Sequence, residues 1–379
     1  MKGRVVIGMS GGVDSSVAAY LLKQQGYDVI GLFMRNWDSL VNNDILGNKS
    51  INDAICPMQV DYLDAKKVAE QLNIDLYRVN FVEEYWQYVF TYFLEKYEGG
   101  RTPNPDILCN KYIKFSAFLN YALEKLNADY IAMGHYAKVK YNDETKKYEL
   151  LKAKDETKDQ TYFLSQLNQE QLAKTIFPLG DIKKVEVRQL AKKLNLVTAN
   201  KKDSTGICFI GKRNFKQFLQ NYIPAQVGNI VDIKSNKVIG THQGIMYYTI
   251  GQRKGIDLSG MNNRYFVVGK DYYQKILFVV SGSDKEWLWA NGCLVTDVNW
   301  INNSLPLLNL PIKAKFRYQQ ISYDVKLLLL DNNCVNVVIA NKVRAITPGQ
   351  VAVFYQGDVC LGSGVIDKVF NDNKLLNYL

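Results

Sequence analysis

Residues 5–16 read Val5-Val6-Ile7-Gly8-Met9-Ser10-Gly11-Gly12-Val13-Asp14-Ser15-Ser16. The apolar residues predict a buried strand, the glycines a tight turn, and the residues after them the start of a helix. Gly11 and Gly12 permit backbone conformations with positive φ and let a ligand approach the main chain closely. The serines and the free amides at the helix start offer donors to an anion at the positive end of a helix dipole. The segment therefore predicts a phosphate site.

Asp14 is the unusual member of this segment. A carboxylate beside a phosphate site is explained if Mg²⁺ lies between them, because Mg²⁺ takes one or two carboxylates together with phosphate oxygens. The lysine of the common P-loop, G-x-x-x-x-G-K-[ST], is absent. The pattern S-G-G-x-D-S of residues 10–15 instead resembles the pyrophosphate loop of the N-type ATP pyrophosphatases, which cleave ATP between the α and β phosphates and leave an adenylated substrate. An ordinary strand-to-helix turn is the alternative, and it explains the glycines but not the Asp and serines beside them.

The composition describes a globular protein of more than one domain. A chain of 379 residues exceeds one typical core, so two or three domains are expected. Lys and Arg number 47 against 37 Asp and Glu, and the net charge of +10 favours a polyanionic partner such as nucleic acid. No apolar run is long enough to cross a bilayer, and the first strand begins within four residues of the start, so we expect a cytoplasmic protein without membrane contact.

The first half of the chain alternates strands and helices. Apolar spacing predicts helices at 13–25, about 60–72 and 83–96, and buried strands at 27–34 and 75–80. This order indicates a Rossmann-like α/β domain with a parallel sheet. Met34 ends the second strand, where it either lies against an adenine or fills the core. Residues 42–52 are polar and irregular, and we expect a mobile loop there.

Residues 99–110 contain two glycines and two prolines. They predict a rigid, non-helical loop that presents Asp106 and Cys109 ahead of a helix at 113–126. Cys109 lies close to a helix start and to Lys111 and Lys114, which should favour its thiolate. Asp106 is either a capping carboxylate or a general acid or base, and the spacing does not separate the two.

Later segments complete the predicted catalytic part and then change character. A strand at 129–137 runs into Gly134, a hairpin turns at 142–143, a helix with a basic face spans 185–194, and a glycine-bounded loop at 203–211 carries Cys208. From about residue 226 the chain reads as all-β. We therefore expect a catalytic domain at 1–215, a central β-rich domain at 216–286 and a C-terminal β-barrel domain at 287–379.

Taken together, these motifs resemble the tRNA-specific 2-thiouridylase family, which places sulfur on the wobble uridine of certain tRNAs. The resemblance spans nearly the whole chain through Ser10–Ser15, Asn104-Pro105-Asp106 with Cys109-Asn110, Gly134-His135-Tyr136-Ala137, Lys158-Asp159-Gln160, Gly206–Gly211 and Gly251–Gly255. It implies that ATP, with Mg²⁺, binds at Gly8, Met9, Ser10, Gly11, Gly12, Val13, Asp14 and Ser15, near Met34 and Gly134. The uridine oxygen on carbon 2 would be adenylated, giving AMP and pyrophosphate.

The same resemblance implies the sulfur chemistry and the partners. Cys208 would receive a persulfide from a relay protein or a cysteine desulfurase, Cys109 would release the sulfur, and a Cys109–Cys208 disulfide would form. Asp106 would lie near the target base. The tRNA anticodon stem-loop would contact Asn104, Pro105, Asp106, His135, Lys158, Asp159, Gln160, Arg317, Tyr318 and Gln350. Arg and Lys suit phosphates, and aromatic rings suit splayed loop bases.

The remaining cysteines limit other interpretations. Cys293, Cys334 and Cys360 lie in apolar runs and are predicted to be core, and Cys56 has no derived role. No two cysteines have C-x-x-C spacing, which disfavours a structural zinc site and an iron–sulfur-dependent RNA thiolase. A pyrophosphate-loop ligase acting on a small molecule explains the ATP loop but gives Cys109 and Cys208 no task. A non-catalytic RNA-binding protein would release neither AMP nor pyrophosphate.

Overall fold

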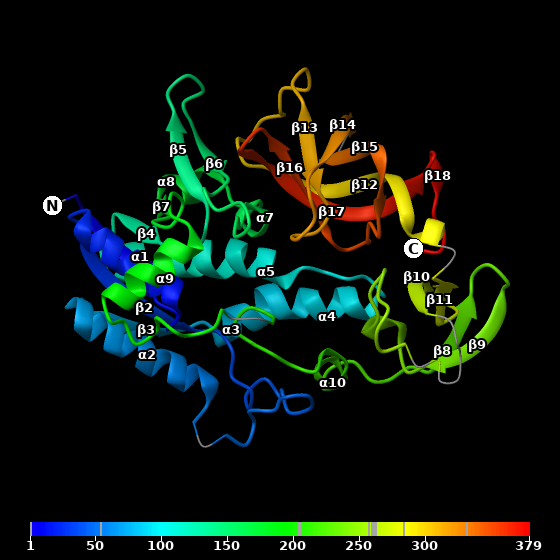
Figure 1. Cartoon of the computed structure of the whole chain (residues 1–379), viewed down its shortest axis with the longest axis horizontal. Coiled ribbons are helices and arrows are strands. Elements are labelled where there is room, and N and C mark those ends of the chain that lie inside the picture. The colour runs from blue at the N-terminus through cyan, green and yellow to red at the C-terminus, as the bar shows by residue number, and fades with distance from the viewer. Residues whose placement is uncertain are drawn as a thin grey trace.

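A parallel sheet organises the N-terminal half of the computed structural model, which describes residues 2–53, 55–203, 206–256, 258, 264–282, 285–330 and 333–379 (Figure 1). Its strands lie in the order β3-β2-β1-β4-β7. Their bounds are β1 Arg4–Gly8, β2 Asp28–Arg35, β3 Leu76–Asn80, β4 Tyr130–Ala132 and β7 Thr175–Ile176. The predicted Rossmann-like domain is confirmed, although the strand expected at 129–137 ends at Ala132.

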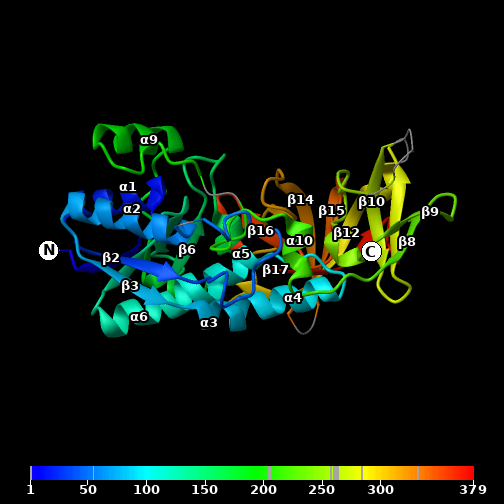
Figure 2. The same cartoon turned by 90° about the horizontal axis from the view of Figure 1, so that it is seen from below.

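Helices cover both faces of this sheet, as Figure 2 shows edge-on. One face packs against α1 (Val13–Gln24), α2 (Pro57–Leu72) and α9 (Lys184–Lys193). The other face packs against two long helical segments. The first runs through α3 (Val82–Tyr85), a π-helical segment (Trp86–Phe90) and α4 (Thr91–Glu98); the second runs through α5 (Pro105–Leu108), a π-helical segment (Cys109–Ala117) and α6 (Phe118–Lys125). Short helices α7 (Thr161–Leu164), α8 (Gln169–Ala173) and α10 (Phe215–Gln220) fill the connections.

The prediction of a non-helical loop through residues 99–110 is wrong for its second half. Helix α5 starts at Pro105, because proline suits the first helical position and the Asn104 side chain caps the helix by accepting from the amide of Asp106 at 3.2 Å. Asp106 and Cys109 therefore lie on a continuous helix, which fixes their side chains more firmly than a loop would.

The second half of the chain is all-β, as predicted. A small sheet has the order β10-β11-β8-β9, with β8 Gly228–Asp232, β9 Lys237–His242, β10 Tyr265–Asp271 and β11 Ile276–Ser281. A barrel follows in the order β12-β15-β14-β13-β16-β17 and closes because β17 also pairs with β12. Its bounds are β12 Trp289–Trp300, β13 Ile312–Lys315, β14 Tyr323–Leu330, β15 Cys334–Arg344, β16 Val351–Gln356 and β17 Val359–Asn371, with β18 Lys374–Leu375 beside β17.

The hairpin β5 (Lys138–Asn142) and β6 (Lys147–Leu151) joins the two halves. It turns after Asn142, as predicted, but β6 pairs with β17, so the hairpin extends the barrel sheet instead of the parallel sheet. The barrel also contacts the N-terminal half directly: the amide of Thr102 donates to the carbonyl of Pro348, just before β16, at 3.2 Å, and Arg101 pairs with Asp367 of β17. The domain limits at 215 and 286 stay a prediction.

The polar segment 42–52 has no regular structure, as predicted, but the polar side chains of Asn42, Asp44 and Asn48 are buried instead of solvated. Asp44 is fully buried and accepts hydrogen bonds from the indole of Trp37 at 3.0 Å and from the guanidinium of Arg213 at 2.7 Å. A buried ion pair with several hydrogen bonds anchors this segment to the chain that follows Cys208.

Replacing Asp44 by Ala is expected to lower the free energy of unfolding by about 3–5 kcal/mol, because it leaves the buried Arg213 guanidinium without its carboxylate. Denaturant titration followed by fluorescence measures the change. Asp53→Ala in the same segment removes an exposed carboxylate and serves as the control, with an expected effect within about 0.5 kcal/mol. Equal stability of both variants would show that the Asp44 pair contributes nothing.

Two further predictions concern the core and the membrane. Cys293 and Cys360 are buried, which confirms them as core residues, whereas Cys334 is only partly buried at the start of β15. In the described part of the chain, no helix combines the length and the apolarity needed to span a bilayer.

Candidate active site

The segment between β1 and α1 forms a cradle of backbone. Gly11 has φ of +71°, and a Cβ there would lie 2.1 Å from the carbonyl oxygen of Asp61, so only glycine fits. The Ser15 hydroxyl accepts from the amide of Ser10 at 3.2 Å and donates to the carbonyl of Gly12 at 3.1 Å, which holds the turn closed. The first amides of α1, from Val13 onward, have no acceptor inside the helix, so they can donate to an anion.

Met34 lies in β2, and Gly134 follows the end of β4; these are the strands on either side of β1. The methyl group of Met34 lies 3.6 Å from where a Cβ on Gly8 would be, and a Cβ on Gly134 would lie 2.9 Å from the amide nitrogen of Ser15. The carboxyl ends of β1, β2 and β4 therefore meet beside the turn, where open α/β sheets bind ligands. The structure brings the predicted nucleotide residues together, and the residues fit a phosphate-binding loop.

Asp14 does not present a preformed magnesium site. Both of its carboxylate oxygens contact the ammonium of Lys184, at 2.6 and 2.7 Å, and the Tyr136 hydroxyl donates to one of them at 2.8 Å. Among the described residues, no group of three or more His, Cys, Asp and Glu side chains could hold a metal. The cation that the chain itself places at the loop is Lys184, and the sequence reading missed it because 170 residues separate it from Asp14.

Asp203 lies at the centre of a cluster of cations. Its carboxylate contacts Lys184 at 2.9 Å, Lys158 at 3.0 Å and Arg188 at 2.7 Å. Burial by itself would raise the pKa of Asp203, but the hydrogen bonds from Lys184 and Lys158 lower it to about 2. The cluster ties the segment before Cys208 to α9 and to the phosphate loop.

The two predicted sulfur residues meet. The Cys109 thiol donates to the Cys208 sulfur with the two Sγ atoms 3.8 Å apart, and neither is in a disulfide. The Asp106 carboxylate accepts from the amide of Cys208 at 3.1 Å, and the Tyr85 hydroxyl donates to the Cys208 carbonyl at 3.0 Å. Two helices thus hold the Cys208 loop by its main chain, one on each side of the residue.

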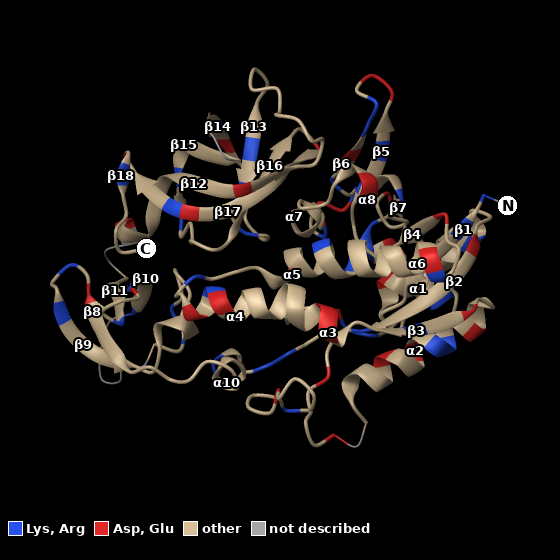
Figure 3. Cartoon of the chain, turned by 180° about the vertical axis from the view of Figure 1, so that it is seen from behind, with Lys and Arg blue, Asp and Glu red and all other residues tan. Residues whose placement is uncertain are grey.

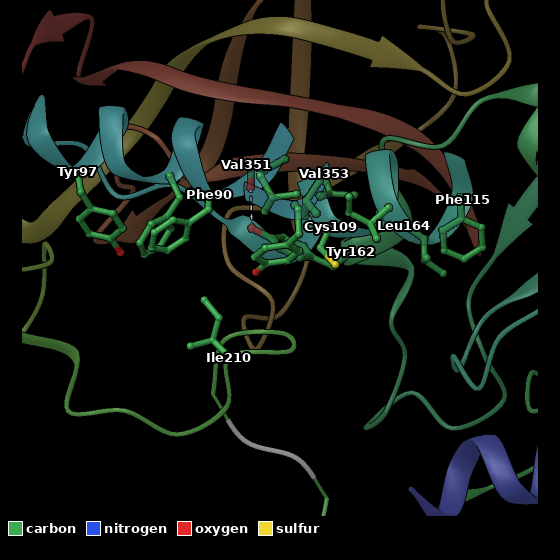
Figure 4. Close-up of a cluster of buried hydrophobic side chains, with 14 of the residues drawn as sticks. Phe90, Tyr97, Cys109, Phe115, Tyr162, Leu164, Ile210, Val351 and Val353 are labelled. Carbon is green, nitrogen blue, oxygen red and sulfur yellow. Dashed lines mark hydrogen bonds between the residues drawn. The ribbon is translucent and has the colours of Figure 1, made fainter. Parts of the chain in front are cut away.

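The prediction that Cys109 is accessible and has a favoured thiolate is wrong. Cys109 is fully buried, and Figure 4 shows its sulfur beside Tyr162, between Ile210 and the barrel residues Val351 and Val353. Burial raises the pKa of the Cys109 thiol, and the neighbouring Cys208 raises it further. The pKa of Cys208 is instead lowered, first by the hydrogen bond from Cys109 and then by the charge of Lys114. Cys208 is thus the readier thiolate of the two.

Asp106 is buried beside these thiols. Burial raises the pKa of its carboxyl, against the opposing effect of the Cys208 amide. Asp106 therefore positions Cys208 through its main chain. Because its carboxyl holds a proton more readily than usual, Asp106 is also suited to general acid chemistry.

The predicted tRNA contacts at 158–160 and His135 are engaged within the protein. Asp159 is buried and accepts from the amide of Ala153 at 3.1 Å, and Gln160 accepts from the amide of Tyr136 at 2.9 Å. His135 is buried against Phe115 and Phe177, and burial lowers its pKa well below the usual value. Its Nδ1 has no hydrogen-bond partner among the described residues, so it has capacity for a ligand.

The predicted contacts in the barrel lie where it meets the rest of the chain. Arg317 donates to the carbonyl of Ile250 and to the Thr347 hydroxyl, and the rings of Tyr318 and Phe163 have centroids 4.4 Å apart. Gln350 donates to the carbonyl of Thr102 at 2.7 Å, just before Asn104 and Pro105. Figure 3 shows basic residues on α2, β9, β13 and β17, so the net charge is not confined to one element.

Comparison with known proteins gives consistent matches over most of the chain. Family models match residues 3–212 (tRNA methyl transferase HUP domain), 216–281 (tRNA methyl transferase PRC-barrel domain) and 290–366 (aminomethyltransferase beta-barrel domain). A protein of Mycoplasma capricolum, named tRNA-specific 2-thiouridylase MnmA, is 63% identical over 373 residues, covering 97% of this chain and 100% of that protein. Proteins of the same name are 57% identical in Mesoplasma florum, covering 97% and 100% of the two chains, and 55% identical in Mycoplasmopsis synoviae, covering 100% and 99%.

Proposed function

From the premise that the chain belongs to the tRNA-specific 2-thiouridylase family, we propose how its residues divide the work of tRNA 2-thiouridylation. The chain is a tRNA-modifying sulfurtransferase, as its relatives are. The observation that carries the proposal is the pair of thiols 3.8 Å apart, held beside Asp106. The phosphate loop lies at the carboxyl edge of the same domain, so activation and sulfur transfer share one domain.

The first stage activates the uridine. The loop from Gly8 to Ser15 holds ATP, with Met34 and Gly134 near the nucleotide. The oxygen on carbon 2 attacks the α phosphate, a bond to that oxygen forms, and pyrophosphate departs with the electron pair of the broken bond. The step is needed because oxide is a poor leaving group and AMP a good one. Lys184, which donates directly to both carboxylate oxygens of Asp14 in this loop, neutralises charge there.

The second stage delivers sulfur from a persulfide on Cys208. Cys109 attacks the Cys208 sulfur as its thiol proton passes to the anionic outer sulfur of the persulfide; a Cys109–Cys208 bond forms, and the outer sulfur leaves as hydrosulfide with the electron pair of the broken S–S bond. Hydrosulfide attacks carbon 2, AMP leaves, and a proton is released to give the thiocarbonyl. A reductant then supplies two electrons to reopen the disulfide. The short distance between the thiols supports direct attack without a change of fold.

The partners follow from this scheme. The tRNA anticodon loop presents the wobble uridine to Asp106, which acts on the base as a general acid or base, and Asn104, Pro105, His135, Lys158, Asp159, Gln160, Arg317, Tyr318 and Gln350 contact the RNA. A cysteine desulfurase or a relay protein donates the persulfide, and we expect the reaction in the cytoplasm, where the tRNA is. Lys158 must exchange its contact with Asp203 for an RNA phosphate.

Incubation of the purified protein with ATP, unmodified tRNA and a persulfide-donating desulfurase tests the proposal. The expected products are 2-thiouridine, AMP and pyrophosphate in equal amounts, measured by nucleoside mass spectrometry and by labelled ATP. Omitting tRNA should stop AMP release. Formation of ADP and phosphate, or AMP release that needs a small molecule and not tRNA, would instead favour the ligase alternative.

A further inference from the structure

The π-helical segment at Cys109–Ala117 changes which side chains face one another. Its hydrogen bonds join residues five apart, as the amide of Phe118 donating to the carbonyl of Ile113 shows. Cys109 and Lys114 are also five apart. In an α-helix, two side chains five positions apart point about 140° away from each other around the helix axis. π-helical winding has more residues per turn, so it brings these two side chains nearer to the same face. π-helical segments inside α-helices occur frequently at functional sites.

The ammonium of Lys114 is enclosed by the groups of the sulfur site. Its Nζ lies 5.6 Å from the ring centroid of Phe209, the residue after Cys208. It interacts with the side chain of Cys208 and, through its charge, with Cys109 and Asp106. Burial would lower the pKa of Lys114, but these neighbours raise it overall, so it stays charged beside the two sulfur atoms.

The other titratable groups around Cys208 do not supply this charge. Asp106 and Tyr85 are acids that contact the Cys208 main chain, and the lowered pKa of His135 keeps it neutral. Lys111, three positions earlier than Lys114, donates to the Gln166 side chain at 3.1 Å and lies over the Tyr112 ring. Within the described residues, Lys114 is therefore the cation that faces both thiols.

We propose that Lys114 is a catalytic residue of the sulfur-transfer step. Its ammonium stabilises the thiolate of Cys208, which accepts sulfur from the donor protein and so becomes the persulfide. When Cys109 attacks the Cys208 sulfur, negative charge remains on the reacting sulfur atoms and leaves with the hydrosulfide, and Lys114 faces both cysteines during this transfer. The ammonium keeps its proton throughout. This inference rests on the proposed function of the two cysteines.

The reactivity of Cys208 tests the proposal in the full-length protein without tRNA or ATP. The variants are Lys114→Gln, Lys114→Arg and, as the matched control on the same helix, Lys111→Gln. Alkylation by iodoacetamide is followed between pH 5 and pH 10, and mass spectrometry of peptides resolves each cysteine, with the exposed Cys56 as internal reference. Thermal melting confirms that each variant is folded.

Removing the Lys114 charge should shift the midpoint of Cys208 alkylation upward by about one pH unit, so that alkylation at pH 7 falls about tenfold. Lys114→Arg should restore most of the rate, because the guanidinium keeps the charge, and Lys111→Gln should match the original protein. In single-turnover sulfur transfer from persulfidated protein to tRNA, Lys114→Gln should be slower by at least the same factor.

An unchanged midpoint of Cys208 alkylation in folded Lys114→Gln would overturn the proposal. A shift in Lys114→Arg as large as that in Lys114→Gln would also overturn it, because the side-chain shape and not the charge would then be responsible. If Lys114→Gln does not fold, Lys114→Arg decides: a midpoint within a few tenths of a pH unit supports the proposal, and a full-unit shift overturns it. Failure of the proposed function is a separate result. It would appear as sulfur transfer that persists when Cys208 is replaced, whatever the midpoint of Cys208 alkylation in the Lys114 variants.

Discussion

Replacing either Cys208 or Cys109 by serine should lower 2-thiouridine formation by about a thousandfold or more, while tRNA-dependent AMP release continues. A serine hydroxyl cannot carry a persulfide, and its high pKa leaves no nucleophile of comparable strength at neutral pH. Nucleoside mass spectrometry of tRNA and release of labelled AMP measure the two stages separately. The separation is expected because the cysteines lie on the helix α5 side of the sheet and the ATP loop at its carboxyl edge.

The two variants should differ in where the sulfur stops. With a desulfurase and labelled cysteine, Cys208→Ser should retain no label on the protein, whereas Cys109→Ser should accumulate a persulfide at Cys208. Cys56→Ser changes an exposed thiol outside the site and should match the original protein. Unchanged thiolation in either active-site variant would reject the two-thiol mechanism, and loss of AMP release in both would show that the stages cannot be separated.

Replacing Gly134 by Ala should weaken ATP binding by about a hundredfold, a loss that equilibrium dialysis with labelled ATP measures. The added methyl carbon would lie 2.9 Å from the Ser15 amide nitrogen and 3.1 Å from the Asp14 carbonyl carbon. Both neighbours are main-chain atoms, so relief requires moving the start of α1 and the donors that it aims at the phosphates. The φ of Gly134 is not positive, so the effect comes from lost space and not from backbone strain.

Gly99→Ala is the matched control for this prediction. Gly99 ends α4 with φ of −74°, and an added Cβ there first meets the Glu95 carbonyl oxygen at 3.5 Å, an ordinary contact. Its ATP affinity should equal that of the original protein. If Gly134→Ala binds ATP equally well while melting normally, ATP binding does not depend on the close approach between α1 and the segment that follows β4.

Local sequence signals were sufficient for the parallel sheet and the glycine turn, whereas the pairing of Cys109 with Cys208 was expected from the family resemblance. Period-two and helical spacing are visible within a dozen residues, and the glycine turn at residues 10–15 needs no distant partner. The error at 99–110 arose because two prolines were read as excluding a helix, when Pro105 occupies the one helical position that favours proline. An Asn directly before that proline was the available signal for a helix start.

The environment of the site depended on contacts that no local pattern contains. Cys109 is buried by Tyr162 and by barrel residues more than 240 positions away, so its raised pKa could not be read from its neighbours in sequence. Lys184 contacts Asp14 although 170 residues separate them in the sequence. No feature of the composition predicts the π-helical segment that contains Lys114. Residues brought together by topology alone were therefore the ones missed.

The pairing of β6 with β17 has a consequence for synthesis on the ribosome. The outer edge of the β5–β6 hairpin emerges long before residues 359–360, to which it pairs, so the nascent chain holds an open β-edge for more than half of translation. The same pairing makes the last strands part of the support for the first domain. Premature termination ahead of β17 should therefore yield an aggregating fragment and not a functional adenylating module.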